Sequence, residues 1–170
     1  CCPNSVVEGW GNNISATYPD SVVHGKTLSP TIDQSDGKNH YLIVNYEAFQ
    51  QENSEALVKR LTEKYKIDFI VIDEIHFSKQ RVVEDMSKRK KMIMGLISHA
   101  GEKNPDLHVF GRSATPVINN LYEGVSLLEM ITGLKYDDLN TKPTVNNCMA
   151  LYQRLTTIGI RWLPQYEQKL

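Results

Sequence analysis

The stretch Phe69-Ile70-Val71-Ile72-Asp73-Glu74-Ile75-His76 runs from four consecutive apolar residues into two adjacent carboxylates and a histidine. An uninterrupted apolar run without period-two alternation is typical of a strand buried on both faces, as in the parallel sheet of an α/β domain. Asp73 and Glu74 then follow the carboxyl end of that strand, which is the edge where ligands bind in open α/β sheets. The stretch therefore predicts an α/β fold with a candidate site at this edge.

The two carboxylates suit the hydrolysis of a metal-bound phosphate chain. Asp73 suits Mg²⁺, a cation that takes oxygen ligands and usually keeps several waters. Glu74 is then free to orient or deprotonate an attacking water. An Asp-Glu pair after a strand can also be a solvated turn, and the pair alone does not separate the two interpretations.

A second segment, Gly111-Arg112-Ser113-Ala114-Thr115-Pro116, follows another apolar run, Leu107-His108-Val109-Phe110. Between the two segments, residues 82–100 carry a mostly helical apolar pattern. A strand, helix and strand in this order form a parallel unit whose strand ends share one edge of the sheet. Ser113 and Thr115 are therefore expected to lie beside His76, although the string alone is an ordinary turn.

Four segments in this order resemble those of the superfamily 2 helicases and translocases, most closely the SNF2-type translocases of double-stranded DNA. Asp73-Glu74-Ile75-His76-Phe77-Ser78-Lys79-Gln80 is similar to motif II, and Ser113-Ala114-Thr115-Pro116-Val117-Ile118-Asn119-Asn120-Leu121 to motif III. Cys2-Pro3-Asn4-Ser5-Val6-Val7 with Trp10 looks like motif Ia, and Val44-Asn45-Tyr46-Glu47 resembles the segment that follows it. The resemblance covers residues 1 to 130.

The resemblance implies a three-layer RecA-like lobe, with a mostly parallel sheet and helices on both faces, and an ATP-dependent DNA translocase or helicase that uses ATP and Mg²⁺. Asp73 would hold Mg²⁺ through water, and Glu74 and His76 would be catalytic. Ser113 and Thr115 of motif III would couple the phosphate state to movement. The residues expected to contact nucleic acid, in particular double-stranded DNA, are Asn4, Ser5, Asn45, Tyr46 and Lys79.

The phosphate loop of that family, Gly-x-x-x-x-Gly-Lys-Thr, does not occur in the sequence. Gly25-Lys26-Thr27 is a poor substitute, because Asp20 stands where the leading glycine belongs and residues 21–24 look like a strand. We therefore expect a fragment of the first lobe, truncated at its phosphate-loop end, in residues 1–133. Residues 134–170 would be a helical extension toward the second lobe, so that the phosphate loop and second lobe of the same polypeptide are expected partners.

Composition predicts an intracellular protein, cytoplasmic (at the nucleoid) or nuclear, without a membrane partner. No apolar run approaches the roughly 18 residues that cross a bilayer, and the three cysteines have no zinc-ligand spacing, which favours free thiols. The net charge of −1 and pI near 6.6 give no global support for nucleic-acid binding. Residues 79–91, however, hold six basic residues against two acidic ones, a local charge of +4. This segment could track phosphates or form a solvated helix face.

Coarse patterns predict the remaining elements. Strands are expected at residues 21–24 and 41–45, and helices at 6–17, 53–64, 120–132, 145–158 and 161–170. Two other functions stay open. One is a non-catalytic helicase-like binding scaffold. The other is a small hydrolase with Asp73, Glu74 and His76 as metal ligands, which is disfavoured because neighbouring residues at a strand end point to opposite faces.

Overall fold

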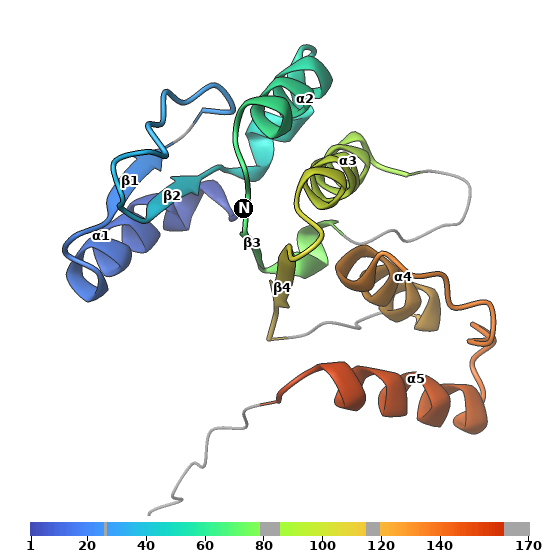
Figure 1. The fold of residues 1–170 in the computed structure, drawn as a ribbon. Helices are drawn as coiled ribbons and strands as arrows, with labels where there is room; N and C mark the ends of the chain where they lie inside the picture. The colour runs from blue at the N-terminus through green and yellow to red at the C-terminus, as the bar shows by residue number, and fades with distance from the viewer. Residues whose placement is uncertain (26, 79–85, 115–119, 162–170) are drawn as a thin grey trace, which may run out of the picture.

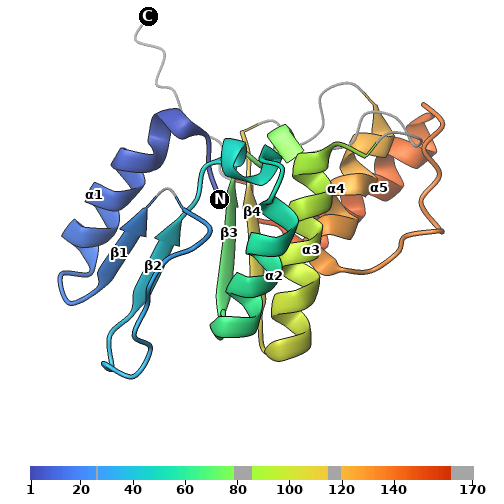
Figure 2. The same ribbon diagram turned by 90° about the horizontal axis from the view of Figure 1, so that it is seen from above.

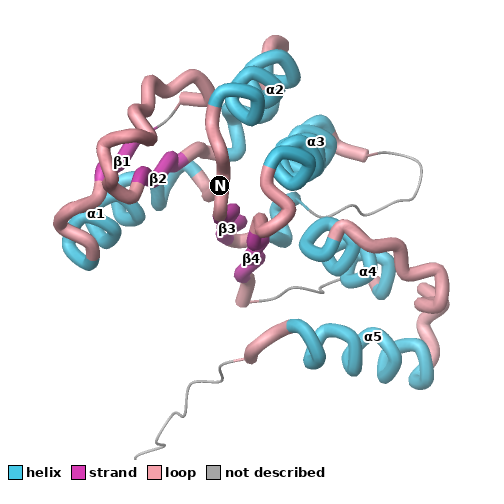
Figure 3. The backbone as a smooth tube through the Cα atoms, viewed as in Figure 1, coloured by secondary structure: helices cyan, strands magenta, loops and turns pink. Residues whose placement is uncertain are grey.

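The computed structural model describes residues 1–25, 27–78, 86–114 and 120–161. It is a mixed α/β structure, as the sequence predicts (Figures 1 and 3). The strands are β1 (Val22–Gly25), β2 (His40–Ile43), β3 (Phe69–Asp73) and β4 (His108–Arg112). The helices are α1 (Val7–Thr17), α2 (Ser54–Lys64), α3 (Lys88–Lys103), α4 (Leu121–Thr132) and α5 (Val145–Ile158), with three short 3₁₀ turns, η1 (Asn4–Val6), η2 (Tyr46–Gln50) and η3 (Ile75–Ser78).

The strands form two parallel pairs, β1 with β2 and β3 with β4. The first two residues of the chain lie between the pairs. Cys2 N donates to Val44 O at 3.0 Å and Tyr46 N donates to Cys2 O, while on the other side Asp73 N donates to Cys1 O at 2.8 Å. These bonds connect the two pairs, and Figure 2 shows the four strands side by side in the order β1, β2, β3, β4.

Helices lie on both sides of the strands (Figure 1). Ile70 and Ile72 of β3 are buried in the main hydrophobic core, which also takes residues from α2 and α3. On the opposite side, α1 packs against β1 and β2, where Val7 of the helix joins Cys2 and Ile43 in a smaller cluster. Because side chains alternate along a strand, the residue pattern of β3 directs Asp73 away from the main core.

The C-terminal helices form a separate apolar cluster. Leu151 is the buried residue of α5, and it packs with Val125, Leu128 and Leu139. Side chains define where both helices begin, since Asn120 accepts from Glu123 N and Thr144 accepts from Asn147 N. The α4 helix ends at Gly133, whose φ of +68° is the left-handed conformation that glycine adopts without strain.

Most predicted elements are present with boundaries shifted by one or two residues. The helix expected over 82–100 begins at Lys88 and runs to Lys103, with the Ser87 side chain accepting from Lys90 N; residues 82–85 lie outside the described part. The helix expected over 161–170 falls almost wholly outside the described residues. The strand before Gly25-Lys26-Thr27 is confirmed, because β1 ends at Gly25. All three cysteines are free, as predicted.

Within the described residues, every helix is too short or too polar to span a membrane.

Candidate active site

Asp73 is the last residue of β3, and its carboxylate is held by two side chains from other elements. Trp10 Nε1 of α1 donates to Asp73 Oδ2 at 2.7 Å. Arg112 is the direct neighbour of Asp73 in the β3–β4 register, and its Nε lies 3.2 Å from Oδ1. The Arg112 guanidinium also lies over the Trp10 ring, 5.5 Å from its centroid. The Asp73 side chain is therefore only 13% exposed.

The backbone of Asp73 is fixed as well. The buried hydroxyl of Tyr46 donates to the Asp73 carbonyl at 2.5 Å, and Asp73 N donates to Cys1 O. Burial raises the pKa of Tyr46, and the nearby Asp73 carboxylate raises it further. A neutral hydroxyl is thus the form present at ordinary pH, which suits a donor to a carbonyl. Asp73 is consequently held at its main chain by Tyr46 and Cys1, and at its side chain by Trp10 and Arg112.

Glu74 leaves the strand through an unusual backbone conformation. Its φ of +51° makes it the one non-glycine residue with positive φ in the described chain. Such a conformation costs on the order of 1 kcal/mol or more, and it interrupts the strand alternation immediately after Asp73. The Glu74 side chain is 39% exposed, with Oε2 3.2 Å from His76 Nδ1 but without an aligned hydrogen bond. The carboxylate therefore has one buried oxygen, Oε2, beside His76, while the side chain as a whole is partly open to solvent.

His76 joins the ends of the two neighbouring strands. A hydrogen bond of 2.8 Å connects His76 Nδ1 with Ser113 Oγ, so the expected contact between these two residues is confirmed. The imidazole also packs on Phe77, with 4.5 Å between ring centroids. Thr115, the other hydroxyl residue predicted here, lies outside the described residues.

The five residues predicted to contact nucleic acid have three different outcomes in the structure. Asn4 and Ser5 are exposed in η1, and Asn45 Nδ2 donates to Asn4 Oδ1 at 3.0 Å, so these three residues lie together at the first turn of the chain. Asn45 also has a structural role, because its Oδ1 accepts from Ala48 N at the start of η2. Tyr46, in contrast, is 2% exposed and directed at Asp73, which gives it a supporting role in this structure. Lys79 lies outside the described residues.

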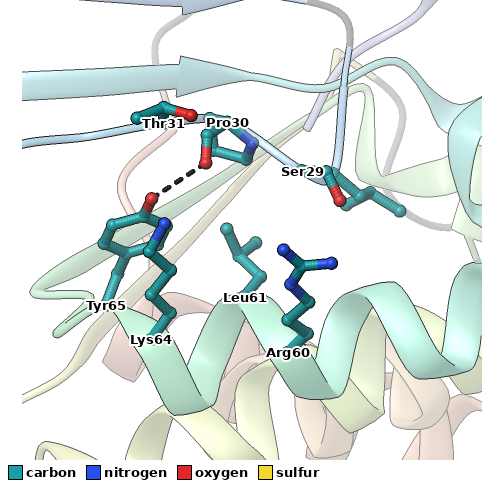
Figure 4. Close-up of a pocket in the computed structure, with 8 residues that line it drawn as sticks. Ser29, Pro30, Thr31, Arg60, Leu61, Lys64 and Tyr65 are labelled. Atoms are coloured by element: carbon teal, nitrogen blue, oxygen red, sulfur yellow. Dashed lines mark hydrogen bonds between the residues drawn. The ribbon is translucent and has the colours of Figure 1, made fainter.

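A pocket elsewhere on the molecule is distinct from this site. It lies between the loop after β1 and the helix α2, with a volume of about 60 Å³ (Figure 4). One wall is closed by Tyr65, whose hydroxyl donates to Pro30 O at 2.8 Å. Pockets for drug-sized ligands and cofactors are typically about 300–1,000 Å³. The pocket on α2 is therefore too small for a nucleotide.

Asp73 fits a magnesium ion that is bound mainly by water and phosphate. Each carboxylate oxygen has two lone pairs, and each oxygen of Asp73 uses one of them on Trp10 or Arg112. One acceptor position per oxygen remains, which agrees with the single carboxylate that Mg²⁺ often takes from a protein at phosphate sites. The described residues contain no group of three His, Cys, Asp or Glu side chains arranged around a common metal position. The donor set thus favours water-mediated binding over a protein cage.

Two residues of the site were not expected from the sequence as parts of it. Arg112 belongs to a segment that the sequence analysis singled out, but its contact with Asp73 follows only from the β3–β4 register, which places the two residues side by side. The predicted parallel strand-helix-strand unit could have indicated this contact, because Asp73 and Arg112 come at the ends of neighbouring strands. Trp10 matched motif Ia, yet nothing in its position along the chain indicates a hydrogen bond to a residue 63 positions away.

The chain matches no protein-family model and no curated protein sequence.

Proposed function

We propose that the chain is part of the first RecA-like lobe of an ATP-dependent DNA translocase or helicase of superfamily 2. The proposal rests on one observation above all. Two motif-like segments, 37 residues apart, meet at the ends of adjacent parallel strands through the His76–Ser113 hydrogen bond. The same edge carries Asp73 and Glu74, so an acidic pair, an imidazole and a hydroxyl converge where α/β sheets bind ligands.

In the proposed reaction, Asp73 binds Mg²⁺ through water and Glu74 orients the water that attacks the γ-phosphate. The metal, when bound with ATP, would neutralise charge on the phosphate oxygens. Phosphoryl transfer of this kind depends on positioning and electrostatic stabilisation, with little covalent chemistry for the protein to do. The rigid support of Asp73 by Tyr46 and Trp10 suits such a task. The Glu74 side chain is more exposed than that of Asp73, 39% against 13%, and its buried Oε2 has no hydrogen-bond partner, so this oxygen is available to a water of the reaction.

His76 and Ser113 would transmit the state of the phosphate site to the rest of the protein. Their hydrogen bond joins η3, which follows the acidic pair, to the segment that follows β4. A change in the position of Glu74 would alter its 3.2 Å approach to His76 and hence the bond to Ser113. Nucleic acid would contact the surface formed by Asn4, Ser5 and Asn45. Contacts of polar side chains with the phosphate backbone position a protein without reading sequence.

The 170 residues alone are expected to hydrolyse ATP negligibly. Their sequence contains no glycine-rich phosphate loop, whose backbone N–H groups would be needed to cradle the phosphates. Activity would require that loop, and a second lobe, from the same polypeptide. Rapid hydrolysis by the purified 170-residue chain, abolished by Glu74→Gln, would contradict this part of the proposal.

The decisive experiment measures DNA-stimulated ATP hydrolysis by the polypeptide expressed from its whole reading frame. Glu74→Gln should reduce the hydrolysis rate by about 100-fold or more while nucleotide binding, followed with a fluorescent ATP analogue, stays within a few fold. Glu102→Gln is the matched control, since Glu102 is 72% exposed on α3 and should leave both quantities unchanged. Joint loss of nucleotide binding and folding in Glu74→Gln would instead assign that residue a structural role.

The non-catalytic scaffold remains the second candidate because of one observation. Both oxygens of Asp73 already contact protein donors, so the carboxylate has internal partners without any metal. In that case the whole polypeptide would bind DNA but would show no ATP hydrolysis, and Glu74→Gln would change neither result. The same two measurements therefore separate the two candidates.

A further inference from the structure

Arg112 places a positive charge beside the Asp73 carboxylate, as a bound metal ion would. Its Nε lies 3.2 Å from Oδ1, while the other carboxylate oxygen is held separately by Trp10. We propose that Arg112 is a displaceable counter-ion of Asp73, which neutralises the carboxylate in the metal-free state and competes with a divalent cation for it. This inference rests on the proposed function only in taking Asp73 as the residue to which a metal binds.

The low exposure of Asp73 explains why a counter-ion is needed. A buried carboxylate without a partner is costly, because it loses its hydration without compensation. The Asp73 side chain is 13% exposed, and the neutral indole N–H of Trp10 supplies a hydrogen bond but no charge. Within the described residues, Arg112 is the positively charged side chain in direct contact with the carboxylate, while the Cys1 ammonium, bonded to Val71 O, acts on Asp73 only through its charge. Its guanidinium therefore balances Asp73 when no metal is bound.

The geometry of Arg112 also allows its guanidinium to move away from the Asp73 carboxylate. The side chain is 57% exposed, and the contact of 3.2 Å joins Nε to one carboxylate oxygen, Oδ1, while Trp10 holds the other. A two-pronged arginine–carboxylate pair would bind more firmly. Because the arginine half of the pair is open to solvent, water can solvate the guanidinium once it leaves, and a cation of higher charge can then compensate the carboxylate in its place. The face of Trp10, over which the guanidinium lies at 5.5 Å, offers a resting place that does not require the carboxylate.

A divalent cation next to Asp73 would repel the guanidinium. Two positive groups within about 4 Å of one carboxylate oppose each other by Coulomb's law, even after screening by solvent. Metal affinity at Asp73 should therefore be lower than the carboxylate alone would give, and it should rise when the charge of Arg112 is removed. Trp10 is unaffected by this competition, because it bonds the other oxygen.

Trp10 provides a direct reporter for the test. The chain has two tryptophans, and the indole N–H signal of Trp10 can be assigned in a ¹H–¹⁵N spectrum of the 170-residue chain with the help of Trp162→Phe. Paramagnetic Mn²⁺ is the probe, since it broadens signals of protons close to it. The Trp10 N–H donates directly to Asp73, so a metal at that carboxylate must broaden its signal.

Arg112→Gln should lower the Mn²⁺ concentration that half-broadens the Trp10 signal by about fivefold, the scale of a partly exposed ion pair. Arg112→Lys keeps the charge and should stay near the wild type. Asp73→Asn should remove the effect in either background, which shows that the metal binds at Asp73. The dispersion of the remaining amide signals verifies that each variant is folded.

Equal Mn²⁺ sensitivity of the wild type and Arg112→Gln would overturn the proposal, as would an Arg112→Gln variant that shows no broadening at millimolar Mn²⁺. Arg112→Lys behaving like Arg112→Gln would also overturn it, because packing on Trp10 rather than charge would then be the property that matters. The experiment contains no nucleotide and no hydrolysis step. A failed ATPase assay with the expected Mn²⁺ result would thus refute the translocase function and leave the counter-ion in place.

Discussion

At the scale of single residues, Tyr46 has the most clearly defined task, since its buried hydroxyl donates to the main-chain carbonyl of Asp73. Tyr46→Phe should lower the free energy of unfolding by about 1–3 kcal/mol at pH 7, because a buried acceptor loses its donor. Urea denaturation measures this difference. Tyr152→Phe is the matched control, since Tyr152 is 53% exposed, and it should change stability by less than about 0.5 kcal/mol.

The stability difference between the wild type and Tyr46→Phe should depend on pH. Burial raises the pKa of Tyr46 above its value in the unfolded chain, near 10. The stabilisation from the protonated native hydroxyl is therefore complete below about pH 10 and is lost as the pH rises toward the native pKa, by roughly 1.4 kcal/mol per pH unit. The stability advantage of the wild type over Tyr46→Phe should shrink between pH 9 and pH 11. A stability difference that stays constant from pH 9 to pH 11 would contradict the raised pKa of Tyr46.

Single residues also show which features of the site can be predicted from the sequence and which cannot. Asp73, Glu74 and His76 stand out because an apolar run ends in polar residues of known chemistry, and this pattern is local. The positive φ of Glu74 is not encoded by its residue type, since glycine or asparagine would be the ordinary choice there. The Arg112 and Trp10 contacts with Asp73 come from packing between distant elements, so they appear only in three dimensions.

At the scale of secondary-structure elements, Gly111 determines how closely β4 approaches its neighbours. A Cβ atom at this position would lie 2.5 Å from Ile75 Cδ1 of η3 and 3.0 Å from Ile131 Cδ1 of α4. Gly111→Ala should therefore destabilise the protein by about 1–3 kcal/mol, as other overpacked positions do. Because both contacted atoms end flexible side chains, the backbone of β4 should be preserved. Thermal or urea unfolding measures the cost.

Gly95→Ala tests whether this effect is specific to the strand. A Cβ at Gly95 of α3 meets no atom within 4 Å, and alanine is favoured over glycine inside a helix. Gly95→Ala should thus raise stability by about 0.5–1 kcal/mol, opposite in sign to Gly111→Ala. Destabilisation of similar size by both substitutions would show that the close approach of β4 is not the cause.

Elements were the part of the fold that the sequence predicted best. Apolar runs located β3 and β4, and their parallel pairing followed from the helix between them. The short turns η2 and η3 carry no such periodicity, so they were not expected. The position of Cys1 and Cys2 between the two strand pairs could not be foreseen either, because two residues are too few to show a strand pattern.

At the scale of the whole molecule, the strands and α5 differ in how they are held. The backbone of β3 has partners on both sides, β4 on one and Cys1 on the other, and its Ile70 and Ile72 lie in the main core. The α5 helix buries only Leu151 and joins a small cluster around α4. Regions with few buried apolar contacts open more easily than core strands. We therefore expect α5 to unfold locally while the sheet stays intact.

Native-state hydrogen exchange tests this expectation. Amides of α5 should exchange with a free energy several kcal/mol below that of the β3 amides. Leu151→Ala should accelerate exchange throughout α5 and leave β3 unchanged, because the cavity belongs to the local cluster. Tyr152→Ala removes an exposed side chain from the next position and should alter neither region appreciably. If Leu151→Ala lowered the protection of β3 and α5 by the same amount, the helix would instead belong to a single cooperative unit with the sheet.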